Sequence, residues 1–423
     1  MFVERSLFKK ILLWLDSPHI LIIKGARRAG KTTLLKFIEE HLKKQGRKTA
    51  FLPVDQYLFE PYFKTPQLFE RYLRQEGLLG GERLYLFLDE VQYLSDPGLF
   101  LKILYDRLSP ELKIIVSGSS SLEISRTKEF LTGRKVEFIL ERFSFLEFLW
   151  AVFPKELWKE APFNSWDEIQ EIFALYQKQL KECFVDYVTW GGYPEVVLTS
   201  LREQKETILR EILSTYLQKD VAGFLNVGNI SAFNHLVRIL ASQIGSLLNK
   251  SELADTLKIR FETVSRYLDI LEGTFIFHLI RPYFSNVRKE LSKNPKVYAR
   301  DFGIIYFSLR RIFDAYEEVS GHEVENFVFR ELMEQFSLED IYFYRTRSGA
   351  EIDFLVFQEK IILLECKFRN QIRIPKIFSN FEERHFEKET LKIIITKDRL
   401  EKLEETYFIP AYLFPLISLK SLL

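Results

Sequence analysis

The sequence has few cysteines and no long hydrophobic run. Cys183 and Cys366 are the only cysteines among its 423 residues, and two thiols so far apart exclude a four-cysteine zinc cage and a disulfide framework. No apolar stretch approaches the roughly 18 residues that a membrane-spanning helix needs. The first residues lack the basic and then apolar pattern of a signal peptide. We therefore expect a cytoplasmic protein that does not contact a membrane.

The sequence also lacks an excess of charge of either sign. It has 60 Lys and Arg against 59 Asp and Glu, a net charge of +1, so contact with nucleic acid would depend on a local basic patch. A hydrophobic content of 47% is typical of a globular chain and not of a disordered one. The length exceeds what one hydrophobic core supports, and predicts about two to four domains.

A phosphate-binding pattern follows the apolar run 19–23. Its residues are Gly25, Ala26, Arg27, Arg28, Ala29, Gly30, Lys31, Thr32 and Thr33. The two glycines allow backbone N–H groups to turn toward phosphate oxygens. Lys31 supplies a positive charge for the outer phosphates, and the hydroxyl of Thr32 can ligate Mg²⁺. The pattern predicts a nucleotide-binding loop between a strand and a helix; a glycine turn before an amphipathic helix is the alternative.

Two acidic residues follow the apolar run 84–88, which suits a strand buried on both faces of a parallel sheet. Ligands bind at the carboxyl ends of such strands. Asp89 is expected to hold Mg²⁺ through water, and Glu90 to orient and deprotonate the attacking water. Because the sequence has no Asn-Lys-x-Asp motif for guanine, ATP is the expected nucleotide.

Three further residues are candidates for the nucleotide site. Ser117 ends the apolar run 112–116 and can place its hydroxyl beside the γ-phosphate, a role compatible with a serine-rich turn that caps a helix. Arg134 could stabilise phosphate charge in its own chain or in a neighbouring subunit, but a surface position is the commoner outcome. Pro194 lies in the rigid turn 190–194 of a largely helical region; this turn either touches the nucleotide base or only breaks a helix.

A helix-turn-helix layout is predicted in the middle of the chain. The short helix, the tight turn and the longer helix are expected at 250–257, 258–260 and 261–272. The run 274–280 can form a wing strand. In a DNA reader the exposed face of the second helix enters the major groove, here with Thr263, Arg266 and the nearby Arg260. Such units also serve as packing modules between ATPase domains.

A basic cluster follows, formed by Arg281, Arg288, Lys289, Lys293, Lys296 and Arg300. It could neutralise the phosphates of a DNA backbone. A solvated linker is the alternative, since Lys293-Asn294-Pro295 resembles a domain boundary.

Near the carboxyl terminus, two β-runs form a predicted hairpin with charged residues on otherwise apolar strands. Asp353 lies in the first run; Glu365 and Lys367 lie in the second, two residues apart and therefore on the same side. Asp353 and Glu365 would bind Mg²⁺, while Lys367 would orient the hydrolytic water. Glu325, at the start of an upstream helix, is placed to add a further acid. An ordinary hairpin with an ion pair is the alternative, although unpaired charges there would be costly.

Together these motifs resemble one family over essentially the full length. It comprises archaeal and bacterial P-loop ATPases of the AAA+/STAND type with a winged helix and a C-terminal restriction-endonuclease-like, or PD-(D/E)xK, domain. The matching segments are 25–33, 86–92, 116–120, 133–134, 190–194, 296–301, 321–328, 351–356 and 365–367. The resemblance implies ATPase roles for Lys31, Thr32, Asp89 and Glu90, and a nucleotide-sensing turn of a helical lid at 191–194.

We therefore predict an α/β protein with four parts. They are a parallel-sheet P-loop ATPase core at 1–148, a helical lid at 149–225, a winged-helix domain at 226–293 and an α/β nuclease-like domain at 294–423. The protein would bind and hydrolyse ATP and couple its nucleotide state to DNA binding or processing, with Mg²⁺ in one or both sites. The alternative is an ATP-dependent switch whose inactive nuclease-like domain binds a partner protein or DNA. A homo-oligomer is compatible with the sequence.

Overall fold

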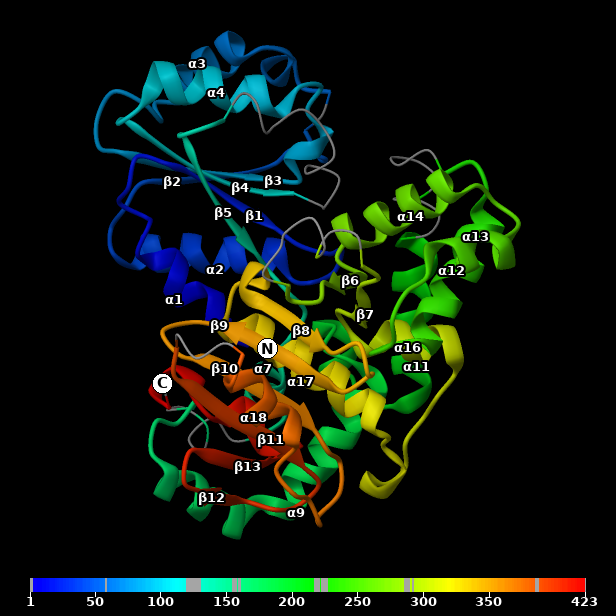
Figure 1. The fold of residues 1–423 in the computed structure, drawn as a ribbon. Helices are drawn as coiled ribbons and strands as arrows, with labels where there is room; N and C mark the ends of the chain where they lie inside the picture. The colour runs from blue at the N-terminus through cyan, green and yellow to red at the C-terminus, as the bar shows by residue number, and fades with distance from the viewer. Residues whose placement is uncertain are drawn as a thin grey trace. The chain divides into compact units, whose positions relative to one another are not determined.

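The computed structural model describes residues 3–57, 59–118, 131–153, 158, 161–216, 221, 227–284, 290, 293–384 and 388–422. The chain divides into two compact units. The first comprises Met1–Phe143, Ser214–Gly228 and Gly273–Phe275, and the second comprises Ser144–Leu213, Asn229–Glu272 and Ile276–Leu423. Both units combine sheets with helices, so the predicted α/β class is confirmed (Figure 1). Among the described residues, no helix is both long and apolar enough to cross a membrane.

The first unit is built on a five-stranded sheet in the order β2-β3-β4-β1-β5, and all neighbouring strands are parallel. Its strands are β1 Ile20–Lys24, β2 Thr49–Pro53, β3 Leu84–Asp89, β4 Leu112–Gly118 and β5 Lys135–Ile139. Strands β1, β3 and β4 are buried along their whole length, as expected for a parallel sheet covered on both faces. Because β4 lies between β3 and β1, the residues that follow these three strands gather at one edge.

Helices cover both faces of this sheet (Figure 1). They are α1 Ser6–Leu12, α2 Lys31–Lys44, α3 Pro66–Gln75 and α4 Pro97–Leu108, with short 3₁₀ turns at Pro61–Lys64 and Val91–Tyr93. One core joins α1 and α2 to the sheet through residues such as Phe8 and Leu35. The other core joins α3 and α4 through residues such as Phe69 and Leu104. Alternate side chains of the central strands serve the two cores, which explains their continuous apolar runs.

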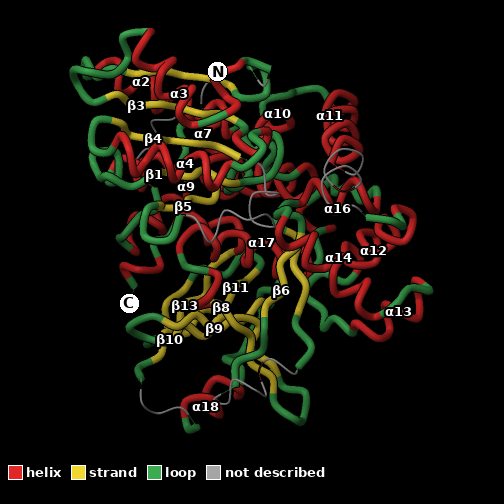
Figure 2. Tube along the Cα trace, turned by 90° about the horizontal axis from the view of Figure 1, so that it is seen from above, coloured by secondary structure: helices red, strands yellow, loops and turns green. Residues whose placement is uncertain are grey.

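The second unit contains a six-stranded mixed sheet in the order β12-β13-β11-β10-β9-β8. Its strands are β8 Ile341–Arg345, β9 Glu351–Phe357, β10 Ile361–Cys366, β11 Thr390–Thr396, β12 Glu401–Leu403 and β13 Thr406–Pro410. Strand β10 pairs antiparallel with β9 and parallel with β11, so the predicted hairpin is confirmed. Helices α17 Gly321–Gln335 and α18 Lys376–Glu382 lie on opposite sides of the sheet (Figure 2).

The remaining elements of this unit are mostly helical. They are α7 Phe145–Val152, α9 Trp166–Trp190, α10 Pro194–Val197, α11 Arg202–Thr215, α12 Ile230–Ser242, α13 Lys250–Leu257, α14 Phe261–Gly273, α16 Phe302–Leu309, the antiparallel strands β6 Phe277–Ile280 and β7 Lys296–Ala299, and 3₁₀ turns at Tyr316–Glu318, Leu338–Asp340, Ala411–Leu416 and Leu419–Ser421. Helix α11 ends at the border of the two units. Helices α13 and α14 lie where the sequence predicts the helix-turn-helix. Strand β6 begins later than the expected wing, because Ile276 first turns back to donate its N–H to Leu271 O at 3.0 Å.

Candidate functional site

The P-loop joins β1 to α2, and its backbone takes conformations that favour glycine. Gly30 has a φ of 97° directly before the first residue of α2. A Cβ atom at Gly25 would lie 2.3 Å from the carbonyl oxygen of Leu140, which leaves no room for a side chain. Lys31 is buried, and its Nζ donates to the carbonyl oxygens of Gly25 and Ala26 at 3.1 and 3.0 Å. The loop thus closes around its own lysine at the amino end of a helix, where the helix dipole attracts anions.

Four polar residues from three segments meet at the carboxyl edge of the sheet. The hydroxyl of Thr32 donates to Oδ2 of Asp89 at 2.6 Å. The hydroxyl of Ser117 donates to the other oxygen of Asp89, and its Oγ accepts the backbone N–H of Glu90 at 3.2 Å. Glu90 has a positive φ of 57°, which turns the chain out of β3. Residues far apart in the sequence are therefore brought into direct contact beside the P-loop.

This arrangement fits a nucleotide with Mg²⁺. The hydroxyl of Thr32 and the carboxylate of Asp89 are oxygen ligands of the kind that Mg²⁺ prefers. Lys31 and the backbone N–H groups at the start of α2 can hold phosphate oxygens. A bound Mg²⁺ would neutralise negative charge on the outer phosphates. Glu90, whose carboxylate accepts from the side-chain amide of Gln92, is an acid at the same edge that can hold a water.

Arg134 lies away from this edge. Its carbonyl oxygen accepts the backbone N–H of Ile20 at 2.8 Å, which places Arg134 at the amino end of β1, whereas the P-loop follows the carboxyl end. Its guanidinium is paired with Asp106 at 2.7 Å. The structure therefore does not bring Arg134 to the P-loop of its own chain, because β5 runs parallel to β1 and begins at the opposite edge of the sheet.

Phe275 is a neighbour of the P-loop that the sequence does not reveal. Its buried ring forms a small apolar cluster with Ala26 and Ala29 of the loop. Its φ of 59° is unusual for a bulky residue, and the buried Arg142 donates to its carbonyl oxygen. In the sequence, Phe275 is one of several apolar residues of an expected wing strand, and no motif marks it.

The turn that contains Pro194 belongs to the second unit. Gly191 has a φ of 79°, and a Cβ atom there would lie 2.2 Å from Oδ1 of Asp301. The N–H of Gly192 donates to Oδ2 of Asp301 at 2.8 Å, and Pro194 begins α10. The turn therefore packs against the aspartate that caps α16. Contact of Pro194 with a nucleotide stays a prediction.

The candidate DNA-binding residues of α14 lie where a ligand could reach them. Arg260, the residue before α14, and Arg266 are exposed, and Thr263 is half-buried. The backbone N–H of Thr263 donates to Arg260 O at 2.9 Å, which fixes the start of the helix. Arg288 and Lys289 fall outside the described residues.

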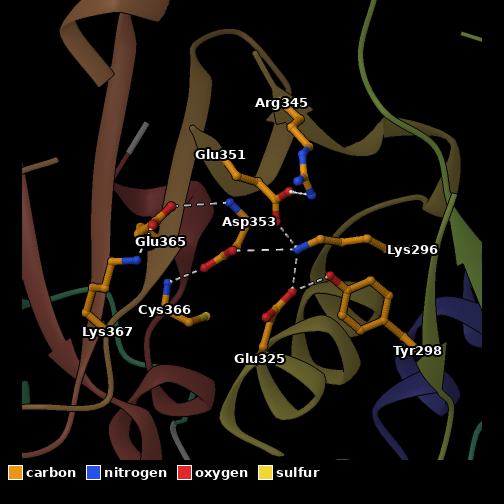
Figure 3. A network of polar contacts seen from close by, with 9 residues as sticks. All are labelled: Lys296, Tyr298, Glu325, Arg345, Glu351, Asp353, Glu365, Cys366 and Lys367. Atoms are coloured by element: carbon orange, nitrogen blue, oxygen red, sulfur yellow. Dashed lines mark hydrogen bonds and ion pairs between the residues drawn. The ribbon is translucent and has the colours of Figure 1, made fainter. Parts of the chain in front are cut away.

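A second group of charged residues lies on β7, α17 and the β9–β10 hairpin (Figure 3). We call its four acids, Glu325, Glu351, Asp353 and Glu365, the carboxylate cluster. The structure confirms the predicted proximity of Asp353 and Glu365, because the backbone N–H of Asp353 donates to Oε2 of Glu365 at 3.4 Å. Lys367 follows β10 directly, and its Nζ lies 2.5 Å from Oε1 of Glu365.

Lys296 occupies the centre of this group. Its Nζ lies 2.5 Å from Glu351 Oε1, 2.9 Å from Glu325 Oε1 and 3.7 Å from Asp353 Oδ1. The sequence suggests that Lys296 belongs to a solvent-facing basic cluster, and this expectation is wrong. Its side chain is 3% exposed and points into the carboxylate cluster (Figure 3).

Burial and mutual repulsion shift the titration of these groups. Burial, together with the charge of Glu325, raises the pKa of Asp353, and burial with the charge of Asp353 raises the pKa of Glu365. Burial alone would lower the pKa of Lys296, but the surrounding carboxylates outweigh it and raise that pKa. Lys296 therefore remains protonated at neutral pH and supplies the charge that these acids need.

The cluster does not fit the Mg²⁺ that the sequence predicts for it. A metal would need deprotonated carboxylates that face a common point. Here the point that Glu325, Glu351 and Asp353 share is the ammonium of Lys296. Within the part of the chain that the structure describes, no set of three or more His, Cys, Asp or Glu side chains is arranged to hold a metal.

The comparison with known protein families agrees with the P-loop observed in the first unit. Residues 17–149 match the family described as an AAA domain. Residues 181–315 and 320–414 match two families described as domains of unknown function, DUF8612 and DUF4143.

Individual relatives match along most of the chain. An uncharacterized protein of Haemophilus influenzae is 25% identical over 96% of this chain and 95% of its own length. The uncharacterized protein MJ1544 of Methanocaldococcus jannaschii is 26% identical over 86% of this chain and 78% of its own length. Among solved structures, the Aeropyrum pernix Orc1 protein in complex with DNA is 14% identical, covers 73% of this chain and 93% of its own, and has a TM-score of 0.30. Such a score establishes neither a common fold nor a common ligand. The supported similarity is to AAA domains, at residues 17–149.

Proposed function

We propose that the first unit binds and hydrolyses ATP. The observation that carries the proposal is the direct contact of Thr32 and Ser117 with Asp89 beside the P-loop. Lys31 would bind the outer phosphates, Thr32 and Asp89 would hold Mg²⁺, and Glu90 would position and deprotonate the attacking water. Ser117 would orient Asp89 and lie beside the γ-phosphate. The match of residues 17–149 to AAA domains supports this assignment.

Two variants test the assignment by separating binding from turnover. Lys31→Ala removes the charge that holds the phosphates, so we expect loss of ATP binding in a fluorescent-nucleotide titration. Glu90→Gln keeps a side chain of the same size, so binding should persist while hydrolysis falls about 100-fold or more. An exposed glutamate of the same unit, Glu40→Gln, is the matched control and should leave both unchanged. Parental hydrolysis by Glu90→Gln would show that another group activates the water.

We further propose that the nucleotide state is coupled to DNA binding through Phe275. Its ring rests on Ala26 and Ala29 of the P-loop, and it follows the end of α14 by two residues. A P-loop that rearranges around phosphates would change the packing of this ring. It would thereby change the conformation of the chain that leaves α14. The positive φ of Phe275 supports this role, because such conformations are costly and are retained where surrounding structure imposes them.

DNA would contact basic residues of the second unit. Arg260, directly before α14, and Arg266, on α14, are exposed, and Thr263 is half-buried. Lys293, Arg345 and Arg347 line a cavity of about 640 Å³ together with aromatic residues, and no acidic residue is among the described residues that line it. Basic side chains interleaved with aromatic rings are typical of nucleic-acid sites. An acidic partner protein is the alternative ligand for the same surfaces.

The coupling is tested by measuring DNA affinity with and without ATP. In the parent chain we expect affinities that differ about fivefold or more, a typical allosteric coupling. Phe275→Ala should still bind ATP but show equal DNA affinity in both states. Phe59→Ala, a change of an exposed phenylalanine in the same unit, is the control. A parent chain that binds DNA equally in both states contradicts the coupling, and one that binds an acidic protein but no DNA favours the alternative.

A further inference from the structure

The carboxylate cluster contains its own cation. Lys296 Nζ lies within 2.9 Å of oxygens of Glu325 and Glu351 and 3.7 Å from Asp353 (Figure 3). We infer that Lys296 is the resident cation of the carboxylate cluster, and that the nuclease-like domain consequently holds no divalent metal there and does not cleave nucleic acid by metal-dependent hydrolysis.

The acids of the cluster are already engaged by donors of the chain. Glu325 Oε1 also accepts the hydroxyl of Tyr298 at 2.6 Å. Oδ2 of Asp353 accepts the backbone N–H of Cys366 at 2.8 Å, and the second oxygen of Glu351 lies 3.2 Å from Nη1 of Arg345. A metal would have to displace several of these contacts, whereas Lys296 pairs with Oε1 of Glu325, Oε1 of Glu351 and Oδ1 of Asp353 while they remain in place.

Glu365 is engaged in the same way. Its two oxygens face Lys367 Nζ at 2.5 Å and the backbone N–H of Asp353 at 3.4 Å. The four acids are thus accompanied by Lys296, Lys367 and Arg345, which leaves a small excess of negative charge. A divalent cation added to this set would meet three positive charges in the immediate surroundings. These positive charges offset most of the attraction that the four carboxylates would otherwise exert on a metal ion.

Lys296 cannot easily leave the cluster. It begins β7, where it pairs with Ile280 of β6, and the N–H of Leu248 donates to the adjacent Pro295 O at 2.8 Å. The backbone of Lys296 is therefore fixed, and its side chain is only 3% exposed. Magnesium ligands lie about 2.0–2.1 Å from the ion, so Mg²⁺ bound to the same oxygens of Glu325 and Glu351 would take the position of Nζ. At these oxygens the lysine and the metal exclude each other.

Titration with Mn²⁺ alone tests the inference on the full-length, nucleotide-free chain. Asp89→Asn is introduced throughout, so that the P-loop edge contributes no metal site. We expect the parent to bind no Mn²⁺ at submillimolar concentrations, as measured by electron paramagnetic resonance. Lys296→Met keeps the length of the side chain and removes its charge, and should gain one Mn²⁺ site. Adding Asp353→Asn should abolish that site.

The matched control is Lys367→Met, the same change at the more exposed rim of the cluster. It should gain no site, because Lys296 still occupies the centre. The inference is overturned if the parent binds one Mn²⁺ that Asp353→Asn removes, or if folded Lys296→Met gains none. If Lys296→Met does not fold, the thermal unfolding midpoint of the parent chain provides the test. A midpoint that rises with Mn²⁺ in the parent, but not in Asp353→Asn, overturns the inference. A midpoint that does not depend on Mn²⁺ supports it.

Discussion

Glu331 provides a quantitative test of how the second unit is held together. It lies on α17, is 3% exposed, and its Oε1 accepts the backbone N–H of Phe145 at 3.0 Å. Burial raises its pKa from 4.5 to about 8, with Arg330 opposing the shift and Glu334 adding to it. Between these two values the folded chain keeps a proton that the unfolded chain releases. Stability must therefore fall as pH rises through this window.

The size of the effect follows from the two pKa values. Each pH unit in the window costs about 1.4 kcal/mol, so raising the pH from 5 to 8 should destabilise the second unit by about 3 kcal/mol through Glu331. Glu331→Gln is neutral at every pH and keeps the oxygen that accepts the N–H of Phe145. The variant should match the parent near pH 5 and exceed it by about 3 kcal/mol at pH 8.

Urea unfolding followed by tryptophan fluorescence at pH 5, 6, 7 and 8 measures this difference. Glu383→Gln removes an exposed carboxylate from the same unit and should leave the pH profile parallel to that of the parent. Since the chain has two units, the comparison uses the transition that Glu331→Gln shifts. Parallel profiles for Glu331→Gln and the parent would refute the reasoning, because they would show that Glu331 is ionised in the folded state.

Three further substitutions test other parts of the structure. Gly191→Ala should destabilise the second unit by about 2–4 kcal/mol in thermal unfolding, since the new Cβ would lie 2.2 Å from Oδ1 of Asp301 and the backbone has a φ of 79°. Gly25→Ala should cost about 2 kcal/mol or more and impair ATP binding, because its Cβ would meet the carbonyl oxygen of Leu140. Arg266→Glu should weaken DNA binding and lower the slope of log K against log salt by about 1 or more, while ATP hydrolysis stays unchanged.

Local patterns were sufficient to predict the elements around the nucleotide site. The apolar runs before Gly25 and Asp89 are continuous because β1 and β3 are buried on both faces. Each run is followed directly by the residues that carry chemistry, so motif and element appear together in the sequence. The same holds for the hairpin of Asp353 and Glu365, whose two strands are adjacent in the chain. Short-range information decides all of these features.

Contacts between distant segments could not be predicted in this way. Lys296 precedes Glu325 and Asp353 by many residues and stands beside Asn294-Pro295, a setting typical of an exposed linker. Only the pairing of β7 with β6 and the packing of α17 direct its side chain inward. The contact of Phe275 could not be predicted for the same reason, because its ring packs on Ala26 and Ala29, which lie far away in the sequence. In both cases tertiary packing overrides what composition suggests.

Phe275 and Lys296 lie close enough in the chain for one short segment to serve both proposals. The described residues between Gly273 and Ala299 place Phe275 on the P-loop alanines, form β6 and β7, and bring Lys296 into the carboxylate cluster. The ion pairs of Lys296 with Glu325 and Glu351 anchor β7 in the carboxylate cluster. A site that held and released metal would loosen the strand through which a nucleotide signal is proposed to pass, whereas a lysine built into that strand keeps it fixed.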